Sequence, residues 1–400
     1  MTEFTKQKKS KYFDYLLLFI VLFLLAFGLV MVYSINAYTV SADSNKGTWD
    51  NVRNQVLAMG IGIVVMLVVS FISTELYRKL HVFIYIFSIL SILLVLTPLG
   101  YEVNGATRWI EIRKGLTFQP AEIAKIGVII FVATILTKMK RSERNSWKGV
   151  LLPLFYTLII CALIVFVTSN LSSAIIIGAI AFCMICMAEG LNYRTLIIIV
   201  SAALVGLLLV LAVVKGWGNG FLSFRGERIL AWLHPEEYAS GKGYQTIQAL
   251  YGIGSGGVFG KGLGKSMQKL GHLPESQNDM IFSIICEELG LFGGLAILVM
   301  FLMLLFRILD IAQHTQNEYD NLLLTGIFAH LALQVIMNVA VVTGLMPNTG
   351  ISLPFISQGG TSVVFLCVEI GIVMRIARNC SFEPPKKVKV KKLKNEEKES

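Results

Sequence analysis

Ten long apolar stretches dominate this sequence and restrict the class of fold that it can adopt. A helix of about 20 apolar residues spans the roughly 30 Å hydrocarbon core of a bilayer and satisfies its own backbone hydrogen bonds there. Hydrophobic residues make up 55% of the 400 positions and charged residues only 15%, more apolar than a soluble core of this length requires. We therefore predict an all-α membrane protein. Its ten transmembrane helices are expected at residues 13–36, 54–73, 77–98, 118–137, 150–168, 171–188, 195–214, 280–306, 322–345 and 355–377.

The distribution of lysine and arginine predicts the orientation of these helices. Basic residues are retained on the cytoplasmic side of short loops, and most of the 35 in this chain share one face if the N-terminus is inside. Both termini are therefore expected in the cytoplasm, with a large extracellular loop at 215–279 between helices seven and eight. The predicted organisation is a cytoplasmic segment (1–12), one membrane domain (13–378) and a basic, disordered cytoplasmic tail (379–400).

Composition and charge argue against several classes of function. The formal net charge of +10 is explained by basic tails beside anionic lipid headgroups, so membrane lipids are expected as partners and nucleic acid is not. The six cysteines lie in or beside apolar runs and indicate neither a disulfide framework nor a zinc site. Cys183 and Cys186 are interpreted as small packing residues and not as a redox or metal pair. The five histidines are scattered, and we predict no metal-ligating residue.

An acidic residue stands at the outer start of the predicted eighth helix. Asp279 directly precedes Met280 and the apolar run that follows it. The helix dipole and the unpaired N–H groups of the first turn favour an ionised carboxylate at such a position. Asp279 can therefore be an N-cap, a general base at the membrane surface, or both.

Ionisable residues inside transmembrane helices are costly and are functional candidates for that reason. Glu122 and Lys125 are three residues apart at the outer end of the fourth predicted helix, so they share a face and can pair. Glu287 and Glu288 lie about two turns into the eighth predicted helix.

Two outer segments carry cations that an anionic ligand would attract. Arg108 and two further cations lie in the loop at 99–117, on the face that disfavours basic residues; exposed, solvated charge is the alternative interpretation. The second segment is the glycine-rich run at 252–265, which contains Lys261. Its spacing fails the G-x-x-x-x-G-K pattern of a nucleotide-binding loop. It is therefore either a re-entrant structural turn or part of an anion-lined groove.

Four separated motifs occur in order along the chain. They are Gly105 to Ile110 followed by Phe118 to Lys125, Gly243 to Gly264, Leu273 to Asp279 followed by Glu287 to Gly290, and Pro347 to Gly360. Together they resemble the SEDS family (shape, elongation, division and sporulation), and the resemblance covers most of the chain. Within the family, the chain resembles the division-type members more than the elongation-type members. Two positions depart from the family pattern, because residues 170–173 read Asn-Leu-Ser-Ser instead of Asp-Leu-Gly-Thr and Gln358 replaces a tyrosine.

The resemblance implies an activity and roles for individual residues. Members of the family are peptidoglycan glycosyltransferases that polymerise lipid II into glycan strands at the outer face of the membrane. Asp279 matches the proposed catalytic residue and would be the general base, while Arg108 and Lys125 would hold pyrophosphate oxygens. The expected substrate-binding residues are Arg108, Lys125, Glu122, Gln119, Lys261, Glu275, Glu288 and Ser357. A divalent cation such as Mg²⁺ could assist at the pyrophosphate, although no motif demonstrates a metal site.

The resemblance also implies partners and a location. A class B penicillin-binding protein, which is a transpeptidase, and other division proteins would assemble with the chain in the bacterial cytoplasmic membrane, enriched at the division septum. Two other classes of function stay open, a transporter that flips lipid II and a non-enzymatic scaffold for division proteins. An expected site at one face of the membrane, and not at its midplane, favours a polymerase. An elongation-type polymerase is the alternative within the family.

Overall fold

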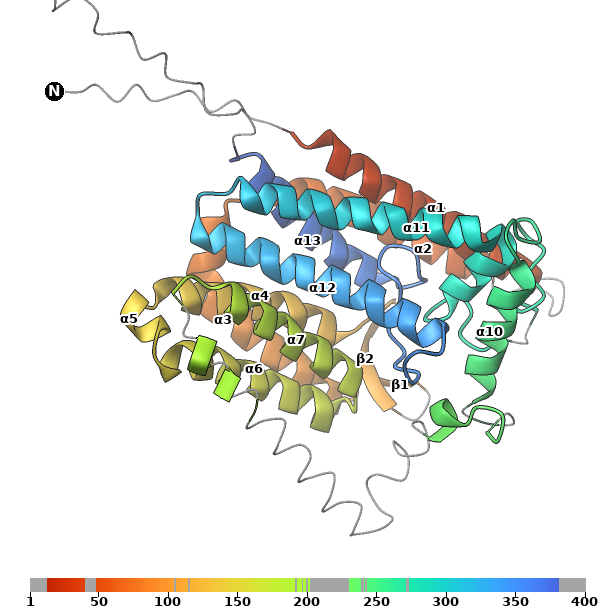
Figure 1. The fold of residues 1–400 in the computed structure, drawn as a ribbon, viewed down its shortest axis with the longest axis horizontal. Coiled ribbons are helices and arrows are strands. Elements are labelled where there is room, and N and C mark those ends of the chain that lie inside the picture. The colour runs from red at the N-terminus through yellow and green to blue at the C-terminus, as the bar shows by residue number, and fades with distance from the viewer. Residues whose placement is uncertain are drawn as a thin grey trace, which may run out of the picture.

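The chain folds into a bundle of long helices with a small β-sheet at one end (Figure 1). The computed structural model describes residues 13–39, 48–103, 106–113, 116–190, 193–195, 197–198, 201, 230–238, 241, 243–270 and 273–380. The helices are α1 (Tyr15–Thr39), α2 (Thr48–Val69), α3 (Thr74–Leu93), η1 (Leu94–Leu96), α4 (Pro120–Lys138), α5 (Arg141–Arg144), α6 (Trp147–Val167), α7 (Leu171–Met187), α10 (Tyr244–Gly256), α11 (Ile281–Gln313), α12 (Glu318–Val342) and α13 (Thr361–Ala377).

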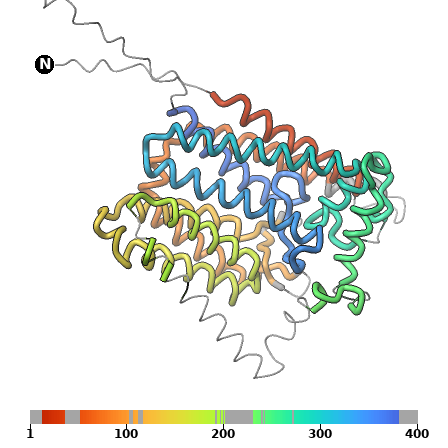
Figure 2. Tube along the Cα trace, in the orientation of Figure 1, coloured from red at the N-terminus to blue at the C-terminus, as the bar shows by residue number. Residues whose placement is uncertain are grey.

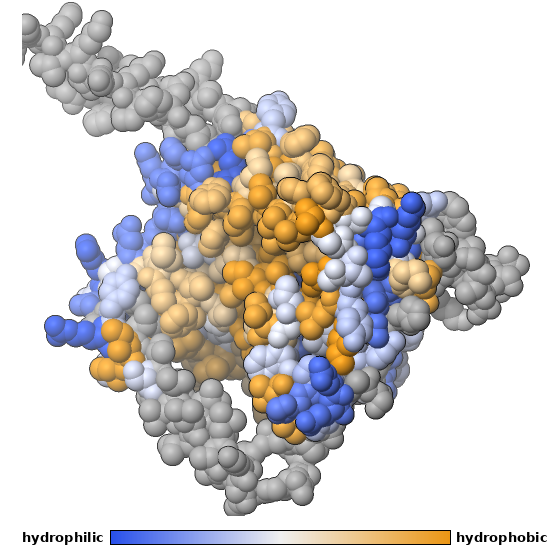
Figure 3. Space-filling model, turned by 45° about the vertical axis from the view of Figure 1, so that its right-hand side comes forward, coloured by the Kyte–Doolittle hydropathy of each residue, from blue (hydrophilic) through white to orange (hydrophobic). Residues whose placement is uncertain are grey.

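Seven helices in the described part of the chain are long and apolar enough to cross a membrane. They are α1, α2, α3, α4, α6, α11 and α12, and the apolar α7 is slightly shorter. The surface agrees with this composition, because hydrophobic residues cover the middle of the bundle and hydrophilic residues gather toward its two ends (Figure 3). These are the features of a multi-pass membrane protein, in which lipid contacts the apolar surface.

The predicted transmembrane segments correspond to helices wherever the structure describes them, with one late start. The tenth segment was expected from residue 355, but α13 begins at Thr361. Phe355 and Gly360 adopt positive φ values of 63° and 42°, which a regular helix cannot contain. The seventh segment, 195–214, lies almost entirely outside the described residues, as do the terminal segment 1–12 and the tail after residue 380. The count of ten helices therefore stays a prediction.

The segment around residues 99–118, expected as an outer loop, contains a β-sheet that the sequence did not predict. Strands β1 (Gly100–Val103), β2 (Ala106–Arg113) and β3 (Leu116–Phe118) pair antiparallel in that order. Thr107, Trp109 and Ile110 are residue types that favour extended backbone, and Ile110 is fully buried against the bundle. The fold is thus mostly helical with one small sheet.

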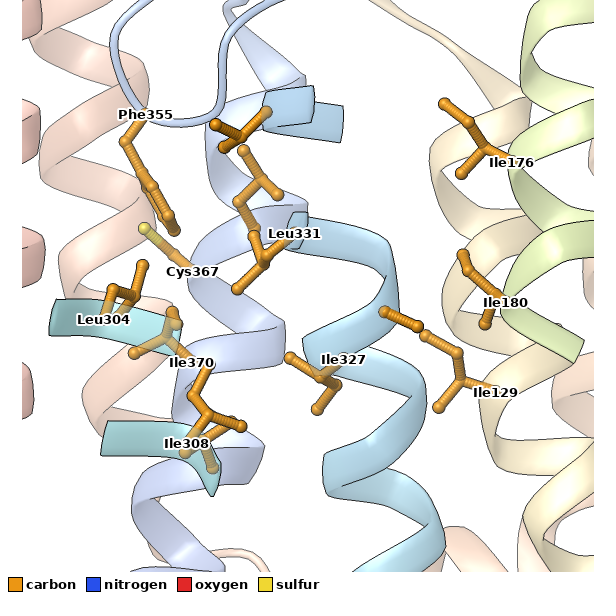
Figure 4. Close-up of a cluster of buried hydrophobic side chains, with 14 of the residues drawn as sticks. Ile129, Ile176, Ile180, Leu304, Ile308, Ile327, Leu331, Phe355, Cys367 and Ile370 are labelled. Atoms are coloured by element: carbon orange, nitrogen blue, oxygen red, sulfur yellow. The ribbon is translucent and has the colours of Figure 1, made fainter. Parts of the chain in front are cut away.

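The core lies where α4, α7, α11, α12 and α13 meet (Figure 4). Larger shares of α4 and α12 are buried than of any other candidate membrane span in the described chain. Ile327 of α12 faces Ile129 of α4 and Ile180 of α7, while Ile308 of α11 lies beside Ile370 of α13 (Figure 4). Buried side chains of this kind make α12 the central helix on which neighbouring helices are packed.

The two ends of the bundle carry different elements. The sheet and α10 lie at one end, together with the start of α11 (Figures 1 and 2). At the opposite end lie α5, the start of α1 and the end of α13 (Figure 1). We call the end that carries the β-sheet and α10 the sheet end. Both segments that were expected as outer loops therefore contribute to one end of the molecule.

Candidate active site

Asp279 lies in a turn at the sheet end, immediately before α11. The N-cap residue of α11 is Met280, so Asp279 stands one residue outside the helix and does not occupy the N-cap position. Its side chain is largely buried. The amide Nε2 of Gln245, from α10, donates a hydrogen bond to Asp279 Oδ1 over 3.5 Å. A carboxylate is thus held between α10 and α11, within reach of the surface at this end.

The backbone of Asp279 is anchored by Asn338 of α12. The amide Nδ2 of Asn338 donates to the carbonyl oxygens of Asp279 and Ile351, each over 2.7 Å. Asn338 is fully buried, so these bonds form away from competing water. Sequence reasoning missed this residue, although an asparagine within an apolar transmembrane segment was an available signal.

Ser357 fixes the same turn from the segment that precedes α13, residues 344–360. Its hydroxyl accepts a hydrogen bond from Leu353 N (2.8 Å) and donates to the carbonyl of Asn278 (2.6 Å). Ser357 was predicted to bind substrate, and its side chain is buried here against the residue that precedes Asp279. The structure therefore gives Ser357 a positioning role, and contact with substrate stays a prediction.

Arg108 projects from β2 toward the junction of α6 and α7. Its guanidinium Nη2 donates to the carbonyl of Ser169 over 3.2 Å. Ser169 has a φ of 50°, and the next residue, Asn170, accepts a hydrogen bond from Ser173 N as the N-cap of α7. The asparagine at which the chain departs from the family pattern therefore begins a helix.

Further hydrogen bonds link this junction to Asp279. Ser172 of α7 donates to the carbonyl of Thr349 over 2.7 Å. The adjacent Asn348 donates to Oε1 of Gln245 over 2.6 Å, and Gln245 is the residue that donates to Asp279. Arg108 and Asp279 are thus connected through α7, the 344–360 segment and α10.

Glu122 and Lys125 of α4 form the predicted ion pair, and two unpredicted residues extend it. Glu122 Oε1 lies 2.8 Å from Lys125 Nζ, which also lies 3.0 Å from His330 Nε2 of α12. His330 Nδ1 in turn lies 2.9 Å from both carboxylate oxygens of Glu369 of α13. All four side chains are buried. We call them the α4–α12–α13 charge chain.

Glu287 and Glu288 form a second buried charged cluster, in the first turns of α11. Glu288 Oε1 lies 2.8 Å from Lys269 Nζ, and Glu287 Oε1 lies 2.7 Å from Lys261 Nζ. Both carboxylates are completely buried. Ser34 of α1 donates to both oxygens of Glu288. Lys261 and Glu288, both expected to bind substrate, are therefore bound to other side chains of this cluster.

Backbone amides of the glycine-rich segment bind carbonyls at an interruption in α11. Gly290 has a φ of 70° and a ψ of −169°, which breaks the helical hydrogen-bond ladder. Lys261 N donates across this break to the carbonyl of Glu287 (3.0 Å). A Cβ on Gly260 would lie 2.2 Å from the carbonyl oxygen of Glu288, so only glycine permits this approach. The segment thus forms a structural turn packed on α11, and both a re-entrant position in the membrane and a role in an anion-lined groove stay predictions.

The remaining predicted site residues lie at the same end. Gln119 is the N-cap residue of α4, directly after β3. Glu275 is exposed in the turn of Asp279 and accepts a hydrogen bond from Asn278 Nδ2 over 2.5 Å. Within the described residues, no group of three or more His, Cys, Asp or Glu side chains could hold a metal ion.

Curated relatives match nearly the full length of the chain. The family model for FtsW, RodA and SpoVE, described as cell cycle protein, matches residues 15–381. A probable peptidoglycan glycosyltransferase FtsW of Bacillus subtilis is 35% identical, over 96% of this chain and 95% of its own length. One of Trichlorobacter lovleyi is also 35% identical, over 93% of this chain and 95% of its own. The stage V sporulation protein E of Bacillus subtilis is 34% identical, over 91% and 97%.

Solved structures share the fold. The structure of a peptidoglycan synthase complex that coordinates polymerization and crosslinking contains a chain with a TM-score of 0.75 and 27% identity, covering 93% of this chain and 99% of that one. The rod shape determining protein RodA of Thermus thermophilus gives a TM-score of 0.65 and 26% identity, over 93% and 98%. The match of the family model and the identity of the relatives confirm the SEDS resemblance. This chain belongs to the FtsW, RodA and SpoVE family of cell cycle proteins.

Proposed function

We propose that this chain is a peptidoglycan glycosyltransferase that polymerises lipid II at the outer face of the bacterial cytoplasmic membrane during cell division. The observation that carries the proposal is the buried Asp279 carboxylate at the sheet end, with its backbone and its side chain each held by a separate helix. Relatives of similar length named as peptidoglycan glycosyltransferases FtsW support the reaction class.

The chemistry needs one base and stabilisation of negative charge. The 4-hydroxyl of a GlcNAc residue attacks the anomeric carbon of MurNAc, the bond to the polyprenyl pyrophosphate breaks, and the hydroxyl proton passes to a base. A single displacement inverts the anomeric centre and gives a β-linked strand. Pyrophosphate leaves as a stable anion, so it requires cations more than a proton donor, unlike the leaving group in glycoside hydrolysis.

The proposed roles follow the geometry. Asp279 is the general base, and Gln245 orients its carboxylate through Oδ1. Arg108, at the same end of the bundle, is the cation for the pyrophosphate, because a guanidinium can donate two parallel hydrogen bonds to phosphate oxygens. Lys125, buried beside Glu122, contributes positive charge from within α4. Glu288 is already paired with Lys269, and no motif or residue cluster of the described chain identifies a metal site, so we assign no step to a metal.

Topology, location and partner are part of the same proposal. Ten transmembrane helices with both termini in the cytoplasm would place the sheet end outside, where lipid II presents its sugars. A class B penicillin-binding protein is the proposed partner, supported by the similarity to a chain of a complex that coordinates polymerization and crosslinking. Enrichment at the division septum is supported by the relatives named FtsW and by the family description.

Purified protein incubated with labelled lipid II in detergent tests the proposal, alone and with its cognate transpeptidase. A polymerase forms glycan strands that a muramidase degrades. A flippase would instead move labelled lipid II across the membrane of liposomes and form no glycan. Neither polymer nor transport, from protein that elutes as a single species, would favour a scaffold and contradict the proposal.

A further inference from the structure

We propose that His330 and Glu369 are positioning residues that hold the ammonium of Lys125 in place for the polymerisation reaction. The inference rests on the proposed function. It adds two side chains that lie further from the sheet end than the turn of Asp279. It starts from the α4–α12–α13 charge chain, in which Glu122, Lys125, His330 and Glu369 follow one another at distances of 2.8, 3.0 and 2.9 Å.

The contacts of His330 determine its protonation. Nδ1 lies 2.9 Å from both oxygens of Glu369, and an ionised carboxylate only accepts hydrogen bonds, so Nδ1 carries the proton. Nε2 lies 3.0 Å from Lys125 Nζ, which only donates, so Nε2 presents its lone pair. Neutral imidazole in this one tautomer satisfies both neighbours. Glu369 thereby fixes the tautomer that lets His330 accept from Lys125.

Burial of these ionisable side chains is costly for the stability of the fold. Lys125, His330 and Glu369 are at most 2% exposed, and charges in such a place cost several kcal/mol to desolvate. Apolar side chains of similar size would pack the three helices at least as well. A chain of ionisable residues that α4, α12 and α13 each contribute to therefore indicates a requirement for charge at Lys125.

A row of buried polar side chains on α12 connects the charge chain to the turn of Asp279. His330, Gln334 and Asn338 follow at intervals of four residues, so they rise by about 12 Å along the helix. All three are buried, and Asn338 donates to the carbonyl of Asp279. The Oε1 atom of Gln334 and the Oδ1 atom of Asn338 are buried and accept no hydrogen bond from the described residues. Buried polar side chains of α12 thus lead from the neighbour of Lys125 to the backbone of the proposed base.

Two substitutions of His330 separate positioning of Lys125 from simple cohesion of the helices. The side-chain amide of glutamine reaches the place of Nε2, so H330Q can still offer an acceptor to Lys125 but leaves Glu369 without its donor. The amide of asparagine reaches the place of Nδ1, so H330N keeps a donor for Glu369 but gives Lys125 no acceptor. If His330 positions Lys125, H330Q should therefore be the more active variant and H330N the more stable one.

The experiment measures lipid II polymerisation rates and thermal unfolding midpoints for purified full-length H330Q and H330N. We expect H330N to be slower than H330Q by about ten-fold, the effect of one hydrogen bond to a charged group, although H330N is the more stable variant. A role in cohesion alone predicts the opposite, with H330Q both less stable and slower. The matched substitutions H314Q and H314N, at the far end of α11, should leave the rate unchanged.

A double variant keeps the inference testable if H330Q does not fold. H330Q/E369Q removes the buried carboxylate that H330Q leaves unpaired, and it should restore the folded species while retaining an acceptor for Lys125. H330N as active as either glutamine variant would overturn the positioning role while leaving the polymerase intact. Wild-type protein that makes no polymer would overturn the proposed function, and the positioning role with it.

Discussion

The ammonium of Lys269 lies 2.8 Å from the carboxylate of Glu288, and neither side chain is exposed. Ser34 of α1 donates to both oxygens of Glu288, and Lys269 also donates to the carbonyl of Ser34. The segment after α10, the first turns of α11 and the C-terminal part of α1 are thus joined at one ion pair. Removing one partner leaves the other charge buried without compensation, which is a severe cost.

Substitution of Lys269 by methionine should destabilise the protein by about 3–5 kcal/mol. K269M keeps an unbranched side chain but removes the terminal ammonium, so most of the loss comes from Glu288, whose charge stays buried without a cation. Thermal unfolding in detergent measures the effect. The double variant K269M/E288Q should recover a large part of the loss, and equal midpoints for wild type and K269M would show that the pair contributes nothing.

Substitution of Gly290 by alanine should prevent the correct packing of the glycine-rich segment on α11. The φ of 70° is unfavourable for alanine, and the new Cβ would lie 2.3 Å from Gly260 N. We expect a loss of more than about 2 kcal/mol, measured as unfolding midpoint and yield of single-species protein. Gly254 is the matched control, because a Cβ there meets no atom within 4 Å, so G254A should be neutral or slightly stabilising.

Substitution of Ser357 by alanine should lower activity more than its modest effect on stability explains. The change leaves Leu353 N–H and the carbonyl of Asn278 without their partner, a cost of about 1–3 kcal/mol, and it loosens the turn of Asp279. Polymerisation rate and unfolding midpoint should be measured together. The control is S91A, whose hydroxyl donates only within α3 to the carbonyl of Ser88, and which should retain the wild-type rate.

Substitution of Arg108 by alanine should weaken the interaction with the pyrophosphate. We expect the lipid II concentration at half-maximal rate to rise about ten-fold, because a charge-assisted hydrogen bond to an anion contributes roughly 1.5–3 kcal/mol. Steady-state kinetics with labelled lipid II provide the measurement. R141A, in α5 at the opposite end of the bundle, should behave as wild type, and a similar loss in both variants would indicate a general effect of charge.

The membrane helices and one ion pair could be predicted from local sequence. Apolar runs of about 20 residues report directly on helices in lipid, since the bilayer permits few alternatives. Glu122 and Lys125 are separated by three residues, so helical geometry alone brings them together. Asp279 could be placed next to a helix start because polar residues there give way at once to an apolar run.

The partners of these residues could not be predicted, because they are distant in sequence. His330 is 205 residues from Lys125, and Asn338 is 59 residues from Asp279. The role of the glycine-rich segment was equally hidden, since its amides bind carbonyls that the break at Gly290 leaves free. The late start of α13 depends on positive φ values at Phe355 and Gly360, and phenylalanine is a residue type that gives no warning of one.

The most direct test of the account is polymerisation of labelled lipid II by purified D279N. The substitution retains the size of the side chain and removes its capacity as a base, so the rate should fall by at least about 100-fold with an unchanged unfolding midpoint. The control D310N makes the same chemical change near the far end of α11 and should retain the wild-type rate. Folded D279N that forms glycan strands at the wild-type rate would contradict the assignment of Asp279 as the general base.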